Sequence, residues 1–175
     1  MTLVELVVSL GVLAVGLLGF LQSIIYAVNL TRAQRETAVV SEIARQTIEN
    51  LRAATFNQVF RLYNVDPNDD PAGVGTGPGN KLSIAGLRTL PGTTDGAIGH
   101  IVFPVRSAGV TSVQVQESVV DSDLGTPRDL NGDGLVDNAD HSSDYRILPV
   151  VIHFDWSGAT GARHMELKTL LADYR

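Results

Sequence analysis

The chain contains no cysteine, which excludes a disulfide scaffold, a thiolate metal site and a cysteine nucleophile. It is also poor in charge, because 18% of its residues are charged against roughly a quarter in an average soluble domain. Its formal net charge is -6, so it has no bulk attraction for nucleic acid phosphates or an anionic membrane surface. A length of 175 residues suits one compact domain with an appendage.

Charge is missing altogether from one N-terminal run, residues 6–29, which reads LVVSLGVLAVGLLGFLQSIIYAVN. A helix of about 20 apolar residues spans the hydrocarbon core of a bilayer, so this run is long enough to cross a membrane. Arg32 and Arg35 follow where such a helix would leave the apolar layer. A secretory signal would begin with positive charge and end at a small-residue cleavage site, and neither feature occurs here. The sequence therefore predicts a membrane helix over residues 1–30.

The one charged residue at the start of this helix is Glu5. A carboxylate costs about 3 kcal/mol at the centre of a membrane span, so it implies a cationic partner. The amino group of Met1 lies one helical turn away on the same face, whereas the next cation is Arg32. We expect Glu5 to pair with this amine, in its own chain or in a neighbouring one. The alternative is a carboxylate that reaches out to the membrane interface.

The opening residues Met-Thr-Leu-Val-Glu-Leu, followed by an apolar helix, resemble the mature N-terminus of type IV pilins and type II secretion pseudopilins. The resemblance implies that a prepilin peptidase cuts after a glycine and methylates the new amine, which makes Met1 the processed residue. It also implies that Glu5 neutralises the amine of an adjacent subunit during assembly. Most family members have phenylalanine where this chain has Met1, and an initiator methionine is the alternative.

The segment LAVGLLGFLQ, residues 13–22, resembles the PilV-type minor pilins, which are the type IV pilus modification proteins. It is less similar to the I-type minor pseudopilins. Major pilins usually carry a helix-breaking proline in this stretch, and this chain has Gly11, Gly16 and Gly19 instead. Each glycine costs a helix roughly 1 kcal/mol relative to alanine and softens it. A small-residue face for close helix packing explains the glycines equally well.

Neither glycine nor proline occurs between Gly19 and Pro67, so we predict one continuous helix from about residue 1 to about residue 62. Its second half, residues 31–63, carries apolar residues on one face and should lie against a sheet formed by residues 64–175. Strands are predicted at about 81–87, 98–105, 110–120, 145–156 and 163–171, with the last two forming a hairpin. The expected fold class is α+β, the type IV pilin fold with a long N-terminal helix packed on an antiparallel sheet.

Residues 129–140, DLNGDGLVDNAD, fit the calcium-loop pattern D-x-[DN]-x-[DN]-G with an acid at the twelfth position. Calcium takes about six to eight oxygen ligands, and alternate residues of a tightly turned loop point inward. Aspartate at the last position resembles dockerin-type loops, and Pro127 argues against a helix before the loop. Gly134 would make the sharp turn. The predicted ligands are Asp129, Asn131, Asp133, the carbonyl of Leu135, Asp137 directly or through water, and Asp140.

Charge around the loop supports a cation site. Residues 121–144 hold seven acids and one base, Arg128, so this segment carries the net charge of the whole chain. Such a cluster repels itself unless a cation or solvent relieves it, and a solvated turn without metal is the alternative. Pilin heads commonly pin the corresponding segment with a disulfide. Bound calcium could take that role here by stabilising the folded form.

Signs of catalysis are lacking. The histidines are scattered without a pair at metal-binding spacing, and neither G-x-S-x-G nor S-x-x-K occurs. His153 and His164 fall in the two strands of the predicted hairpin, where paired surface histidines are the common explanation. We therefore expect that the protein is not an enzyme.

The resemblance implies a minor pilin, a structural subunit that primes pilus assembly and sits at or near the tip. Its implied partners are the major pilin, other minor pilins, a tip adhesin, the inner-membrane assembly platform and the prepilin peptidase. It would lie in the inner membrane of a Gram-negative-type bacterium before assembly and in the extracellular pilus afterwards. Two alternatives are a minor pseudopilin of a type II secretion system and a membrane-anchored calcium-dependent binding module.

Overall fold

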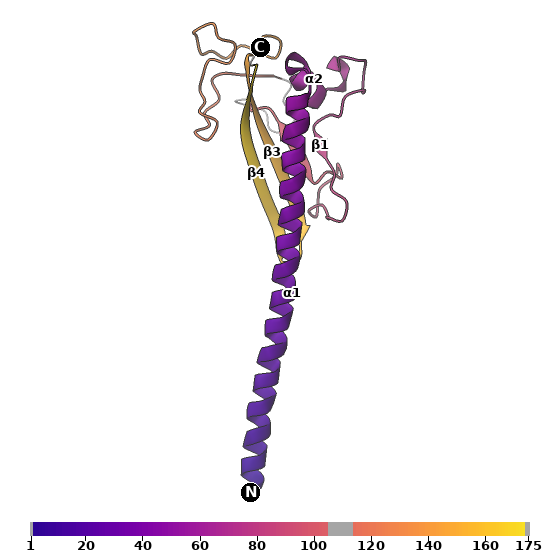
Figure 1. The fold of residues 1–175 in the computed structure, drawn as a ribbon, viewed down its shortest axis with the longest axis vertical. Helices are drawn as coiled ribbons and strands as arrows, with labels where there is room; N and C mark the ends of the chain where they lie inside the picture. Colours follow the sequence, from indigo (N-terminus) through magenta and orange to yellow (C-terminus); the bar gives the residue numbers. More distant parts are fainter. Residues whose placement is uncertain (1, 105–113, 174–175) are drawn as a thin grey trace.

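A long helix and a small antiparallel sheet make up the molecule, for which a computed structural model describes residues 2–104 and 114–173. Figure 1 shows the helix as a rod whose C-terminal half lies beside the sheet while its N-terminal half projects away. This is the predicted α+β layout, and it matches the pilin fold. The elements are α1 (Leu3–Ala53), η1 (Phe56–Gln58), α2 (Val59–Tyr63), η2 (Pro67–Asp69), β1 (Lys81–Leu82), β2 (Gly99–Val102), β3 (Ile147–Gly158) and β4 (Gly161–Ala172).

The prediction of one helix to about residue 62 is wrong at its C-terminal end. α1 stops at Ala53, and Ala54 is extended with φ -68° and ψ 157°. We call the packed half of α1, the sheet and the loops around them the head. One side chain of the head, Tyr145, hydrogen-bonds to backbone groups just beyond Ala54. Its hydroxyl donates to the carbonyl of Phe56 at 2.7 Å and accepts the N–H of Phe60 at 3.3 Å. These tertiary hydrogen bonds compete with the helical ladder, and the chain turns through η1 into α2.

The sheet has the strand order β1-β2-β3-β4, and all neighbouring strands are antiparallel. The hairpin of the last two predicted strands is confirmed, since β3 and β4 pair from Ile147↔Ala172 to Gly158↔Gly161. The two preceding strands are shorter than predicted, at two and four residues. β4 forms one edge of this sheet.

The predicted strand at 110–120 is not a strand over residues 114–120, and residues 110–113 lie outside the described part of the chain. Backbone groups in this segment bond to the acidic loop instead of to a neighbouring strand. The N–H of Val115 donates to the Asp140 carboxylate at 3.0 Å, and its carbonyl accepts the N–H of His141 at 2.8 Å. The alternation of the sequence is still seen in burial, because Val115 and Glu117, two residues apart, are both buried.

The core lies between α1 and the inner face of β3. Five alternate residues of β3 are at most 2% exposed, and the buried face of α1 includes Val40, Ala44 and Leu51. Burial of such side chains contributes about 25 cal/mol per Å² of apolar surface and is the main force holding the helix to the sheet. The five buried β3 residues are Leu148, Val150, Ile152, Phe154 and Trp156. The opposite face of the β3–β4 hairpin therefore points away from α1.

Candidate functional site

The N-terminal half of α1 presents apolar side chains on all its sides. Every residue from Thr2 to Val28 is exposed. The most apolar window of the helix has a mean hydropathy of 2.4, and none of it is buried inside the structure. By length and composition the helix can cross a membrane. An apolar surface of this extent requires a membrane or other helices to cover it.

Glu5, the predicted assembly residue, lies in the first turn of α1. Thr2 caps this helix: its hydroxyl accepts the N–H of Glu5 at 3.4 Å, and its own N–H donates to the Glu5 carboxylate at 3.4 Å. This reciprocal capping box satisfies backbone donors that a helix N-terminus leaves free. The predicted pairing of Glu5 with the amine of Met1 falls on a residue outside the described part of the chain.

The packed half of α1 is tied to the β3–β4 hairpin through Glu36. Its carboxylate accepts the backbone N–H of Ala159, in the hairpin turn, at 3.1 Å. It also accepts the indole N–H of Trp156 at 3.4 Å. These two contacts join helix and hairpin at the point where α1 leaves the head, so the exposed half projects beyond the head.

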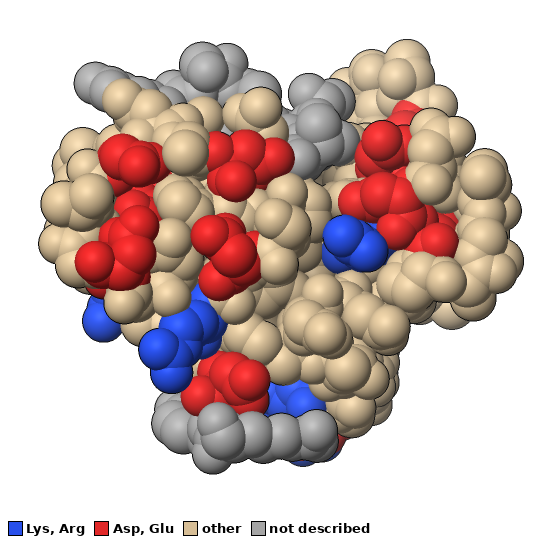
Figure 2. Space-filling view, turned by 90° about the horizontal axis from the view of Figure 1, so that it is seen from above, with Lys and Arg blue, Asp and Glu red and all other residues tan. Residues whose placement is uncertain are grey.

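The predicted calcium loop lies at the end of the head farthest from the N-terminus (Figure 1). Figure 2, seen from that end, shows several groups of acidic side chains and few basic ones. Residues 114–146 form turns, bends and one isolated β-bridge without a helix, so the prediction of a loop without flanking helices is confirmed.

Asp129, the first predicted ligand, organises a tight turn. Its two carboxylate oxygens accept the N–H of Gly132 at 2.5 Å and of Gly134 at 2.8 Å. Both glycines have φ angles in the left-handed region, 85° and 88°, which side chains rarely tolerate. The hydrogen bonds from Gly134 and then Gly132 lower the pKa of Asp129, so its carboxylate stays charged to a lower pH.

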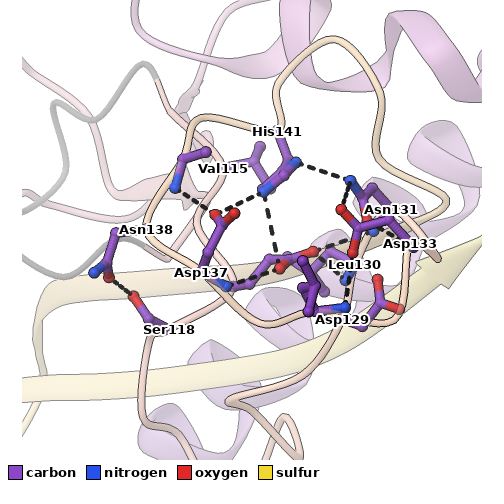
Figure 3. A network of polar contacts seen from close by, with 12 residues as sticks. Val115, Ser118, Asp129, Leu130, Asn131, Asp133, Asp137, Asn138 and His141 are labelled. Atoms are coloured by element: carbon purple, nitrogen blue, oxygen red, sulfur yellow. Dashed lines mark hydrogen bonds and ion pairs between the residues drawn. The ribbon is translucent and has the colours of Figure 1, made fainter.

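The next predicted ligands continue this turn. Asn131 accepts the N–H of Asp133 at 3.0 Å, and its amide nitrogen donates to the Asp133 carboxylate at 3.3 Å. Asp133 in turn accepts the N–H of Leu135 at 2.8 Å. Figure 3 shows Asp129, Asn131 and Asp133 together on one side of the polar network. The structure therefore brings the first three predicted side-chain ligands together.

Asp137 lies on the other side of the network, beside a histidine (Figure 3). Its carboxylate accepts the N–H of Ala139 at 2.6 Å and lies 3.2 Å from Nε2 of His141. The Ala139 N–H and then His141 lower the pKa of Asp137. Burial acts to lower the pKa of His141, but its hydrogen bonds to Asp137 and Asp144 and the nearby charge of Glu117 outweigh burial and raise it.

Glu117, which the sequence analysis did not single out, lies between the two halves of the loop. It is only 1% exposed, and its carboxylate accepts the N–H of Leu130 at 2.7 Å, of Asn131 at 3.3 Å and of Asp137 at 3.2 Å. The signal for its burial was its place in the apolar phase of the alternating segment around Val115. A buried carboxylate with three backbone donors fixes the loop from inside.

Asp140, the predicted closing ligand, is engaged in hydrogen bonds outside the turn built by Asp129, Asn131 and Asp133. Its carboxylate accepts the N–H of Val115 at 3.0 Å, and it also accepts the N–H and the hydroxyl of Ser142, each at 3.0 Å. The donor set of carboxylates and an amide suits a hard cation such as calcium. The first half of the loop offers this donor set, whereas Asp137 and Asp140 form hydrogen bonds elsewhere in the structure.

Among the described residues, two groups of three metal-ligating side chains have ligand atoms within 4.8 Å of one another. One is Glu117, Asp137 and His141, at the loop. The other lies on the outer face of the hairpin and contains the two histidines that the sequence analysis found without metal-binding spacing. Comparison with protein-family models, with curated proteins and with solved structures found no match.

Proposed function

We propose that this chain is a minor pilin of a type IV pilus, a structural subunit that primes filament assembly and sits at or near the tip. The observation that carries the proposal is the helix α1, whose N-terminal half is an apolar rod that no described residue of the head covers. This rod is continuous with a half that packs on the sheet. Parallel packing of such rods in a filament core buries their apolar surface. The resemblance of residues 1–6 and 13–22 to minor pilins points the same way.

Glu5 is the residue proposed to guide assembly. Its capping contacts with Thr2 are long, at 3.4 Å, so a cation can replace them at small cost. In lipid or in a filament core an unpaired carboxylate is expensive, and the terminal amine of a neighbouring subunit relieves that cost. The pair forms only when two helices are in the correct register.

Calcium is the proposed cofactor of the head. The turn built by Asp129, Asn131 and Asp133 supports this, as does the acidic character of that end of the molecule. The proposed role is structural, not catalytic: the ion fixes the distal loop that would meet other subunits. The proposed partners are the major pilin, other minor pilins, a tip adhesin, the inner-membrane assembly platform and the prepilin peptidase.

The experiment is complementation of a deletion strain of the source bacterium with Glu5→Ala, followed by immunoblotting of sheared surface filaments. Loss of the pair between Glu5 and the neighbouring amine costs on the order of 3 kcal/mol. This cost corresponds to a roughly hundredfold lower incorporation into filaments. Glu49→Ala is the matched control, because Glu49 is an exposed acid on the same helix, bonded to Arg45. We expect the Glu5 variant to remain in the membrane and the Glu49 variant to enter filaments.

Normal incorporation of Glu5→Ala would overturn the proposal. If deletion leaves surface pili intact but blocks protein secretion, the protein would instead be assigned to the pseudopilus of a type II secretion system. Mass spectrometry of the native N-terminus gives an independent readout, for which we expect a methylated amine.

A further inference from the structure

Three side chains able to ligate a metal meet on the hairpin face that points away from α1. The β3–β4 register pairs His153 with Glu166 and Asp155 with His164, so the two histidines lie diagonally across the strands. One carboxylate oxygen of Glu166, Oε2, lies 3.1 Å from Nδ1 of His153 and 3.9 Å from Nε2 of His164. The two imidazole rings have centroids 6.1 Å apart. Strand pairing alone creates this cluster, which is why spacing along the chain does not reveal it.

We propose that His153, His164 and Glu166 form a binding site for a divalent transition-metal ion of the zinc type. Two imidazoles and one carboxylate suit zinc, copper or nickel, whereas calcium prefers oxygen ligands alone. Zinc holds such atoms at about 2.0–2.2 Å, which sets them roughly 3.3–3.5 Å from each other in a tetrahedral site. The distances of 3.1 and 3.9 Å bracket that separation, and the ligand atoms of all three residues lie within 4.8 Å of one another, so side-chain adjustments of about an ångström bring them to it.

Asp155 prepares His164 for this role. Its carboxylate lies 2.9 Å from Nδ1 of His164, and because an ionised carboxylate can only accept, this contact favours the tautomer in which Nδ1–H donates to it. The other nitrogen, Nε2, then carries a lone pair and faces Glu166. Histidines that bind metals almost always donate their second ring N–H to a carboxylate or carbonyl in this way. The hairpin thus supplies a ligand together with the group that orients it.

Glu166 is also held in place from its far side. Lys168 lies 3.2 Å from the second carboxylate oxygen, Oε1, which leaves Oε2 turned toward the imidazoles. Lys168 is a cation close to a cation site, which opposes binding. Two further acids offset it, because Asp121 and Asp123 lie 2.8 and 3.1 Å from the same ammonium group. The surroundings of the cluster are therefore negative in sum.

The cluster is open to solvent, so an ion can reach it without unfolding the hairpin. The side chain of His164 is 57% exposed, and those of His153 and Glu166 are 30% and 29% exposed. Three protein ligands leave a fourth coordination position of a tetrahedral ion free. That position takes water or a donor from another molecule. Such an ion would clamp the edge strand β4 to β3.

Zinc titration of the full chain in detergent, after removal of bound metals, tests the proposal. Calorimetry is performed with zinc chloride in buffer that contains calcium chloride, so that the acidic loop has its own cation. We expect one zinc ion per chain, and a rise in the unfolding temperature on zinc addition. Both effects should be lost in His164→Gln and in Glu166→Gln. Asp155→Asn should weaken binding by about 10- to 100-fold, because the orienting partner is lost.

His100→Gln is the matched control. His100 pairs with His153 across β2 and β3, lies 2.7 Å from Asp95, and is not one of the three cluster residues. We expect zinc binding in this variant to equal that of the unchanged chain. The proposal is overturned if the unchanged chain fails to bind zinc, or if His164→Gln and Glu166→Gln bind it as tightly. It is also overturned if His141→Gln, at the acidic loop, is the variant that loses zinc.

Discussion

Glu117 brings a negative charge into the interior of the loop segment, where water cannot solvate it. Three backbone N–H groups, from Leu130, Asn131 and Asp137, donate to its carboxylate. Nε2 of His141 lies 3.8 Å from Oε2 of this carboxylate. Because all three donors belong to the loop, this one side chain links both of its halves. Removing it leaves the buried N–H of Leu130 and the part-buried N–H groups of Asn131 and Asp137 without this acceptor.

We predict that Glu117→Ala lowers the free energy of unfolding by about 3 kcal/mol, because hydrogen bonds to a charged acceptor contribute roughly 1.5–3 kcal/mol and the N–H of Leu130 stays buried. Glu117→Gln keeps one acceptor oxygen and should cost less. The measurement is urea unfolding followed by the fluorescence of Trp156, the single tryptophan, which is 2% exposed in the core. Glu49→Ala on the exposed face of α1 is the control, with an expected cost below about 0.5 kcal/mol. Equal stability of the two alanine variants would contradict this role for Glu117.

Among single residues, sequence reasoning found those whose chemistry is local. The turn from Asp129 to Gly134 follows from side chains and glycines within a few positions of each other. Glu117 contacts a loop more than ten residues further along the chain, and His153 meets Glu166 only through strand register. Contacts of this kind depend on tertiary packing, which single-sequence patterns do not encode.

At the scale of elements, the acidic loop is held in shape by its own side chains. Its side chains cap one another's backbone groups, so the turn forms through its own hydrogen bonds. Like charges remain close together in it, and a cation would relieve their repulsion. The first half of the loop is therefore preformed, and a bound cation would lower the electrostatic repulsion between its carboxylates.

We predict that calcium raises the unfolding temperature of the detergent-solubilised chain and that a calcium chelator lowers it. An ion that binds only the folded state adds about 2.7 kcal/mol at a concentration 100 times its dissociation constant. Asp133→Asn should lose the response, since it removes one predicted ligand charge, whereas Glu49→Gln on α1 should keep it. An unfolding temperature indifferent to calcium, with no metal detected by elemental analysis, would rule the ion out.

Elements with a strong local pattern were predicted well, and those fixed by long-range contacts were not. The apolar run, the amphipathic half of α1 and the β3–β4 hairpin follow from periodicity and turn residues. The end of α1 was predicted too late because Tyr145, far along the chain, captures backbone groups of Phe56 and Phe60. The strand predicted at 110–120 failed over its described residues for the same kind of reason. Its backbone hydrogen bonds go to the loop.

The molecule as a whole divides into a head that buries its own core and a helical half that leaves its apolar residues uncovered. Ala33 is the first buried residue of α1, and all the other buried positions of the helix follow it. Among the described residues, the exposed half contributes none to the core, so the stability of the head should not depend on it. Its apolar surface instead governs how the full chain associates.

We predict that removal of residues 1–28 leaves the unfolding temperature of the head unchanged and yields a monomer without detergent. The full chain should need detergent or lipid, because its uncovered apolar surface drives association. Light scattering after size exclusion and thermal unfolding monitored by Trp156 fluorescence check both expectations. A fall of more than about 3 °C, near 1 kcal/mol for a domain of this size, would mean that the missing half supports the head.

The continuity of α1 has a mechanical consequence. Because one uninterrupted helix runs from the projecting rod into the core, tension on the rod acts along the axis of the packed half. Such tension loads the packing contacts of Val40, Ala44 and Leu51 at the same time, in shear. In peeling, these contacts would break one after another. The three glycines lie in the projecting half, where helical turns are weakest. Stretching under tension should therefore begin in the rod and spare the head.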